Sequence, residues 1–117
     1  MKRSFKLLLI GLSMVLCVGS GSIVMAQDVI KIGALATLEG AFTVLGQDAI
    51  RGIKLALKEH NNTAGGKKIE LITMSSDASP DSAIRAAKKL VEQDKVDLVI
   101  GPVSGSEGIA LKDYAKT

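Results

Sequence analysis

The chain has 117 residues, 47% of them hydrophobic, and a formal net charge of +3 from 15 Lys and Arg against 12 Asp and Glu. Three basic residues lie within the first six positions, so residues 27–117 carry 12 basic and 12 acidic side chains and no net charge. This balance gives no support for binding to nucleic acid.

The first 26 residues have the three-part layout of a secretory signal peptide. A basic start precedes an apolar run over residues 7–18, and Val24-Met25-Ala26 fits the cleavage site. We therefore expect cleavage before Gln27 and export to the periplasm. Residues 7–26 are also about long enough for an uncleaved membrane anchor, but several glycines and serines dilute the run.

Cys17 is the only cysteine and offers lipidation as another alternative. The bulky Leu16 precedes it, where a lipidated cysteine usually follows a small residue, and apolar signal residues continue beyond it. We therefore expect no lipid anchor. The mature chain then has no cysteine and no disulfide.

Three short runs rich in β-branched residues predict strands at residues 29–35, 69–74 and 96–100. The third run is nearly continuous in apolar character toward its end, which is typical of a strand buried on both faces of a parallel sheet.

Between the predicted strands, apolar residues recur at helical spacing. The first predicted helix runs to about Glu59, where residues 61–66 predict a turn, and its inner face comprises Ala49, Ile50, Ile53, Ala56 and Leu57. Ser79 followed by Pro80 predicts the start of the second helix, as an N-cap and first helical residue. The inner face of that helix comprises Ile84, Ala87, Leu90 and Val91.

Residues 111–117 are amphipathic and contain no stop signal such as a C-cap glycine. We expect the chain to end inside a helix, and to be the front part of a longer protein.

Alternating strands and helices predict an α/β fold in three layers, with a doubly wound parallel sheet and right-handed crossovers. In such sheets, ligands bind beyond the carboxyl ends of the strands. That edge carries three predicted loops, at residues 36–46, 75–79 and 101–106.

The third of these loops belongs to the segment IGPVSGSEG, residues 100–108, and is the candidate site. If Ser106 caps the following helix, the nearby amides point into the cleft with the helix dipole behind them. Ser104 and Ser106 could then donate hydroxyl hydrogen bonds to a carboxylate or another anion. An ordinary cap and turn without a ligand explains the same residues.

Catalytic and cofactor-binding motifs are weak. The first loop lacks the G-x-G-x-x-G spacing, and the GGKK of residues 65–68 precedes a strand, whereas a phosphate-binding loop joins a strand to a helix. No cluster has metal-ligand spacing, and we expect no cofactor. An exported α/β enzyme would need a catalytic group among Ser104, Ser106, Glu107, Asp77 and His60, where no nucleophile has an identifiable base.

From residue 29 to residue 115, the sequence resembles the periplasmic solute-binding proteins for leucine, isoleucine and valine that serve ABC transporters. The resemblance rests on a combination of motifs. These are I-G in the first strand, Gly40, Gly46 and Gly52 leading into the first helix, N-x-x-G-G before the second strand, D-x-S after it, and V-I-G-P-V-S at the third strand.

The resemblance implies a two-lobed Venus-flytrap fold of the type I periplasmic binding proteins. In this family the lobes close on a ligand by a hinge motion and deliver it unchanged to a membrane permease. Residues 27–117 would then be the N-terminal portion of the ligand-binding domain, an incomplete N-terminal lobe. A sensory receptor ectodomain that uses the same lobe is the alternative.

The resemblance also implies site residues. In the family, the loop after the third strand holds the α-carboxylate of an amino acid through a serine hydroxyl and backbone amides, and the matching positions are Ser104, Gly105 and Ser106. Many relatives have a serine pair where this chain has Ser104 and Gly105. Several have an aromatic side-chain contact where this chain has Leu45. The expected ligand is a branched-chain amino acid or a related amide, although relatives also take urea and aromatic acids.

Overall fold

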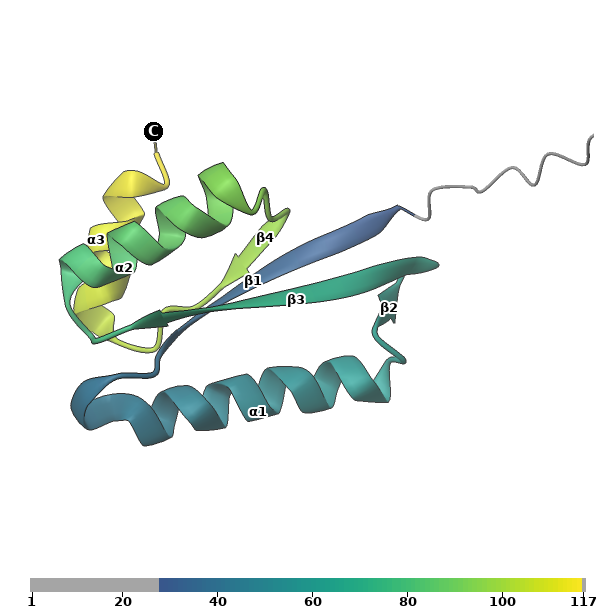
Figure 1. Cartoon of the computed structure of the whole chain (residues 1–117), viewed down its shortest axis with the longest axis horizontal. Helices are drawn as coiled ribbons and strands as arrows, with labels where there is room; N and C mark the ends of the chain where they lie inside the picture. The colour runs from purple at the N-terminus through teal and green to yellow at the C-terminus, as the bar shows by residue number, and fades with distance from the viewer. Residues whose placement is uncertain (1–27, 117) are drawn as a thin grey trace, which may run out of the picture.

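The computed structural model describes residues 28–116, in which helices cover both faces of a sheet (Figure 1). The expected signal peptide, residues 1–26, lies outside the described residues. The helical elements are η1 (Gly40–Phe42), α1 (Thr43–Glu59), α2 (Pro80–Lys88), its π-helical continuation η2 (Lys89–Gln93) and α3 (Gly105–Tyr114). No helix of the described part is long and apolar enough to cross a membrane.

The predicted parallel sheet is confirmed. β1 (Val29–Thr37) lies between β3 (Lys67–Ser76) and β4 (Leu98–Ile100), and it pairs in parallel with both. The last residue of β1, Thr37, is level with Ser76, the last residue of β3.

The sheet also contains a short antiparallel strand that the sequence did not predict. β2 (Thr63–Ala64) pairs with Lys67 and Lys68, so the strand order is β2-β3-β1-β4. Two residues of the predicted turn, 63 and 64, therefore form a strand, and its last two, Gly65 and Gly66, lie between β2 and β3 with φ of 56° and 79°. Positive φ at both positions is typical of a two-residue hairpin turn.

Side chains alternate across β1, so its two faces pack against different helices. Ala34 and Ala36 pack with Ile50 of α1. Leu35 points to the other face, where it packs with Leu90 and with Ala83 and Ala86. The alternation of small and large residues along one strand therefore produces the three layers of the predicted doubly wound fold.

The start of α2 is as predicted, but part of its inner face is not. The Ser79 hydroxyl accepts a hydrogen bond from the N–H of Ser82 at 3.3 Å, and Pro80 is the first helical residue. Val91 is 43% exposed, however. It lies in η2, whose wider π-helical turn departs from the 3.6-residue period on which the prediction depended. The buried side chains are Ala83, Ala86, Ala87 and Leu90.

The prediction that the third strand is buried on both faces is wrong. β4 is the outermost strand, and Leu98 and Ile100 are 54% and 39% exposed. Both are level with β1 residues of the face that α1 covers, namely Ile32 and Ala34. Because α1 packs against β1, it does not cover these outer side chains.

The last helix ends earlier than expected. α3 stops at Tyr114, and the N–H of its C-cap residue, Ala115, donates to the carbonyl of Leu111 at 2.9 Å. The expectation that the chain ends inside a helix is therefore wrong for the described residues.

Gly46 provides a stability test of the packing of α1 on β1. A Cβ added at Gly46 would overlap the backbone carbonyl of Thr37, which cannot move without disturbing the sheet. We expect Gly46→Ala to destabilise the fold by about 1–3 kcal/mol or more in urea unfolding. Gly52→Ala is the matched control, because nothing lies within 4 Å of the added atom. It should stabilise α1 by about 0.5–1 kcal/mol, and equal effects of the two substitutions would contradict this account.

Candidate ligand-binding site

The loops that follow β1, β3 and β4 meet at one edge of the sheet, as the sequence predicts. The N–H of Leu38 donates to the carbonyl of Ser76 at 3.1 Å, which joins the first loop to the second. The hydroxyl of Ser106 donates to the carbonyl of Ala78 at 3.2 Å, which joins the third loop to the second.

A pocket of about 250 Å³ opens at this edge, between the N-terminal ends of α1 and α3. Its lining residues are Thr37, Phe42, Leu45, Val103, Ser104 and Gly105. Three of the four predicted site residues, Leu45, Ser104 and Gly105, therefore lie around one cavity. Ser106 does not line it.

Ser106 also does not cap α3. The N-cap position belongs to Ser104, with φ of −88° and ψ of 138°, and Ser106 lies inside the first turn. The Ser104 side chain makes no capping hydrogen bond either; the two hydroxyl oxygens are hydrogen-bonded to each other at 2.8 Å. The prediction of Ser106 as the cap is therefore wrong, because the helix begins at Gly105.

The first turn of α3 offers backbone donors beside the pocket. Among residues 28–116, no acceptor pairs with the N–H groups of Gly105, Ser106 or Glu107. Unpaired N–H groups at the start of a helix carry partial positive charge. They suit a carboxylate or another small anion.

Two buried polar residues at the pocket were not predicted as ligand-binding residues from the sequence. Thr37 and Glu107 are both fully buried. The Thr37 hydroxyl donates to Glu107 Oε2 at 3.3 Å and accepts from the Ser76 hydroxyl at 3.5 Å. Sequence reasoning considered Glu107 only as a catalytic group. The S-x-x-E spacing from Ser104, which places a glutamate in the first turn of a helix, was the signal available.

His60 lies apart from the other candidate catalytic groups. His60 is the C-cap of α1, and the N-terminal end of that helix borders the pocket. The 17 residues of α1 make it about 25 Å long, so the single histidine lies far from Ser104. Among the described residues, no group of three or more His, Cys, Asp or Glu could hold a metal ion.

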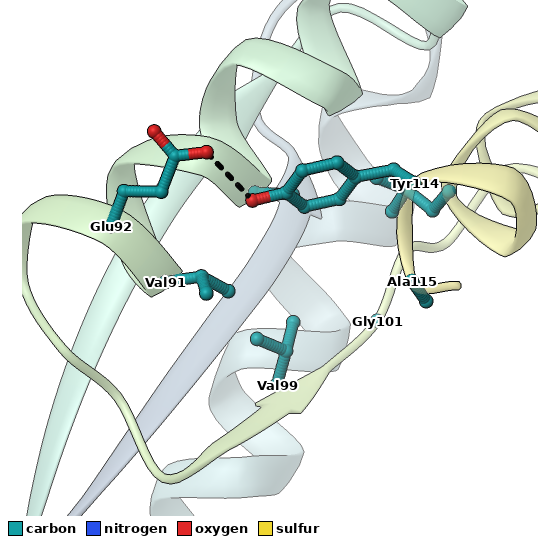
Figure 2. A pocket seen from close by; sticks show the side chains of 8 residues that line it. Val91, Glu92, Val99, Gly101, Tyr114 and Ala115 are labelled. Carbon is teal, nitrogen blue, oxygen red and sulfur yellow. Dashed lines mark hydrogen bonds between the residues drawn. The ribbon is translucent and has the colours of Figure 1, made fainter. Parts of the chain in front are cut away.

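A larger cavity, about 630 Å³, is a mainly apolar groove along β4, between η2 and α3. Figure 2 shows Val91 and Val99 in this groove and the Tyr114 hydroxyl directed at Glu92, to which it donates at 3.2 Å. Burial and this hydrogen bond raise the pKa of Tyr114 above its ordinary value. The groove runs beside the uncovered edge of the sheet and contains neither Leu45 nor the predicted serines. The smaller pocket is therefore the candidate ligand site.

Comparison with known proteins agrees with this architecture. Residues 29–117 match the periplasmic binding protein family. The chain belongs to this family. A curated relative of this periplasmic binding protein, Leu/Ile/Val-binding protein homolog 8 of Brucella suis, is 31% identical over 111 residues, which are 93% of this chain and 27% of that protein.

Solved structures of ABC transporter binding proteins share the fold. The substrate-binding protein from Sphaerobacter thermophilus is 36% identical with a TM-score of 0.73, over 76% of this chain and 24% of that chain. A Rhodopseudomonas palustris solute-binding protein, solved with 3,4-dihydroxybenzoic acid, is 33% identical with a TM-score of 0.71, over 75% of this chain and 24% of that one.

A third structure is the branched-chain amino acid transporter substrate-binding protein from Streptococcus pneumoniae, solved with isoleucine. It is 28% identical with a TM-score of 0.71, over 76% of this chain and 26% of that chain. This periplasmic binding protein chain thus spans about a quarter of the length of the relatives it matches. Those relatives are substrate-binding proteins, and none of the three structures is described as an enzyme.

Asp77 gives a pH-dependent test of the second loop. The Ser79 hydroxyl and N–H donate to its carboxylate at 2.6 and 2.9 Å, and they lower the pKa of Asp77 below its ordinary value. The ionised form therefore stabilises the fold above the ordinary pKa, and this stabilisation is lost as pH falls through the lowered value. We expect Ser79→Ala to return the pKa toward normal in a carboxyl ¹³C NMR titration. The Ser75 hydroxyl donates to Glu39 instead, so Ser75→Ala should leave the pKa of Asp77 unchanged.

Proposed function

We propose that this chain is the ligand-binding part of an extracytoplasmic binding protein that serves an ABC importer. The ligand is a small carboxylate with a compact apolar body, such as a branched-chain amino acid or a related compound. The supporting observation is that one pocket combines three apolar side chains with the N-terminal end of α3.

The polar side of the pocket suits the carboxylate. Gly105 lines the pocket as the first residue of α3, and its N–H has no acceptor among the described residues. Ser104 lines the same side. Because the Ser106 hydroxyl donates to the carbonyl of Ala78, the Ser104 hydroxyl is the donor to Ser106, and it can turn this donor to a ligand. A ligand carboxylate there would replace water on donors that already point outward.

The apolar side suits the remainder of the ligand. Phe42, Leu45 and Val103 are 51%, 54% and 38% exposed, so they offer apolar surface that a ligand can cover. Two relatives were solved with isoleucine and with 3,4-dihydroxybenzoic acid. Both compounds join a carboxylate to a compact group, an alkyl side chain in one and a dihydroxylated ring in the other. We place the ligand of this chain in the same chemical class.

We propose that this chain contributes one half of the ligand-binding site. The lining side chains stay largely exposed, and the relatives have about four times as much chain. A second lobe would close over the ligand by hinge motion, and a membrane permease would recognise the closed form. The chain would reach the periplasm through the signal peptide of residues 1–26 and would be released by cleavage before Gln27.

Titration of the mature chain, residues 27–117, with leucine, isoleucine and benzoate tests the binding site. A half site should bind with a Kd on the order of 1 mM or weaker, with ¹H–¹⁵N shifts at Gly105 and Leu45. Leucinamide, which lacks the carboxylate, should cause smaller shifts at Gly105. Micromolar affinity for leucine in isothermal titration would contradict the half site, and shifts confined to the groove beside β4 would contradict its location.

Leu45→Ala and Leu55→Ala form a matched pair for the apolar wall. Both leucines lie on α1 with similar exposure, 54% and 59%, but only Leu45 lines the pocket. Removing the Leu45 side chain should weaken isoleucine binding about threefold to tenfold, because less apolar surface is covered. Leu55→Ala should bind like the unaltered chain, and equal weakening by both would remove Leu45 from the site.

Export has its own test. Mass spectrometry of the periplasmic fraction should give a mature protein that begins at Gln27, and Cys17→Ala should change neither cleavage nor location. A lipid-modified N-terminus at Cys17 would overturn the proposed processing.

A further inference from the structure

Glu107 lies in an unusual environment for a carboxylate. It is in the first turn of α3 and is fully buried, and only its Oε2 accepts a hydrogen bond within the described part of the chain. The other oxygen, Oε1, is buried without a hydrogen-bond partner among the described residues. A buried acceptor without a donor opposes folding, so an apolar side chain of similar size would suit this position better if stability alone mattered.

The single donor to Glu107 connects both walls of the pocket. Thr37 lines the pocket, and its hydroxyl binds the carboxylate of Glu107 on α3. The backbone carbonyl of the same residue lies against Gly46 of α1, so closely that a Cβ there would overlap it. Thr37 is also held by Ser76, its register partner on β3. One residue of the central strand therefore contacts the helix that carries Leu45 and the helix that begins with Gly105.

We propose that Glu107 is a positioning residue for the ligand site. Its hydrogen bond to Thr37 holds the first turn of α3 against the end of β1, and so sets the direction of the Gly105 and Ser106 N–H groups. Because Glu107 is fully buried, it acts through this contact and does not touch the ligand. The consequence for binding rests on the proposed function, whereas the positioning itself can be measured without a ligand.

Two pairs of variants of the mature chain test the contact. Glu107→Met and Thr37→Val remove one partner each with little change in shape, whereas Glu107→Gln and Thr37→Ser keep an acceptor and a donor. We expect the first pair to shift the ¹H–¹⁵N resonances of Gly105 and Ser106. Hydrogen exchange should accelerate about tenfold at the amide of Gly108, which donates to the carbonyl of Ser104 at 3.1 Å. The conservative pair should restore the unaltered behaviour, and Gly65 and Gly66, in the hairpin turn, should not respond in any variant.

Thermal unfolding separates positioning from general stability. Glu107→Met removes an unpaired buried oxygen but also leaves the buried Thr37 hydroxyl without its acceptor. The two effects oppose each other, so its melting temperature should change little. The double variant Thr37→Val/Glu107→Met should repeat the resonance changes of the single variants without adding to them. If Glu107→Met leaves the Gly105 and Ser106 resonances in place, or if all changes follow the loss of melting temperature, the proposal is wrong.

Isoleucine titration of the same variants tests whether the position of α3 affects ligand binding. Weaker binding by Glu107→Met, with normal binding by Glu107→Gln, supports positioning of the ligand site, because Glu107 does not line the pocket. Failure of every variant and of the unaltered chain to bind isoleucine, leucine or benzoate would reject the proposed function. The ligand-free resonances would still decide whether Glu107 positions α3.

Discussion

The parallel pairing of β3, β1 and β4 is the constraint on which the candidate site depends. Parallel strands end at the same edge of a sheet, so Thr37 and Ser76 occupy one level and the segment after β4 arrives beside them. α3 begins at Gly105, shortly after β4, and its unpaired N–H groups therefore emerge where the other two strands end. The carboxylate site that we propose at this edge depends on strand direction together with a short connection between strand and helix.

Two opposite charges are built into the first turn of α3. The N–H groups of the helix start present partial positive charge to the pocket, while the carboxyl group of Glu107 lies behind them in the interior. The helix start stabilises a carboxylate in this position, and the carboxylate in turn reduces the positive potential that a ligand meets. The pocket is therefore suited to short-range hydrogen bonding and contact with apolar surface more than to long-range attraction of anions.

Local signals in the sequence were sufficient for much of the fold. β-branched runs located β1, β3 and β4, and Ser79-Pro80 located the start of α2, because these patterns act within a few residues. The exposure of Leu98 could not be predicted, since an apolar run is the same in a central strand and in an outer strand. The turn η2 could not be predicted from a period of 3.6, and it moved Val91 to the surface.

The candidate site was predictable in position but only partly in detail. Loop order predicted the loop that carries Ser104, and the family resemblance added Gly105 and Leu45; all three line one pocket. The direction of the Ser106 hydroxyl depends on the carbonyl of Ala78, which is 28 residues away in sequence. The partner of Glu107 is 70 residues away. Such pairings come from tertiary packing, and one sequence without its fold does not contain them.

The outer edge of β4 has a consequence for handling the chain by itself. No strand of residues 28–116 lies beside the backbone N–H and C=O groups of this edge. Leu98, Val99 and Ile100 include no charge or proline that would discourage pairing. An exposed apolar edge of this kind is a template for adding a strand from another molecule. Copies of the chain will therefore associate through this edge as concentration rises. Dilute samples or a fused solubilising partner will keep the chain in solution.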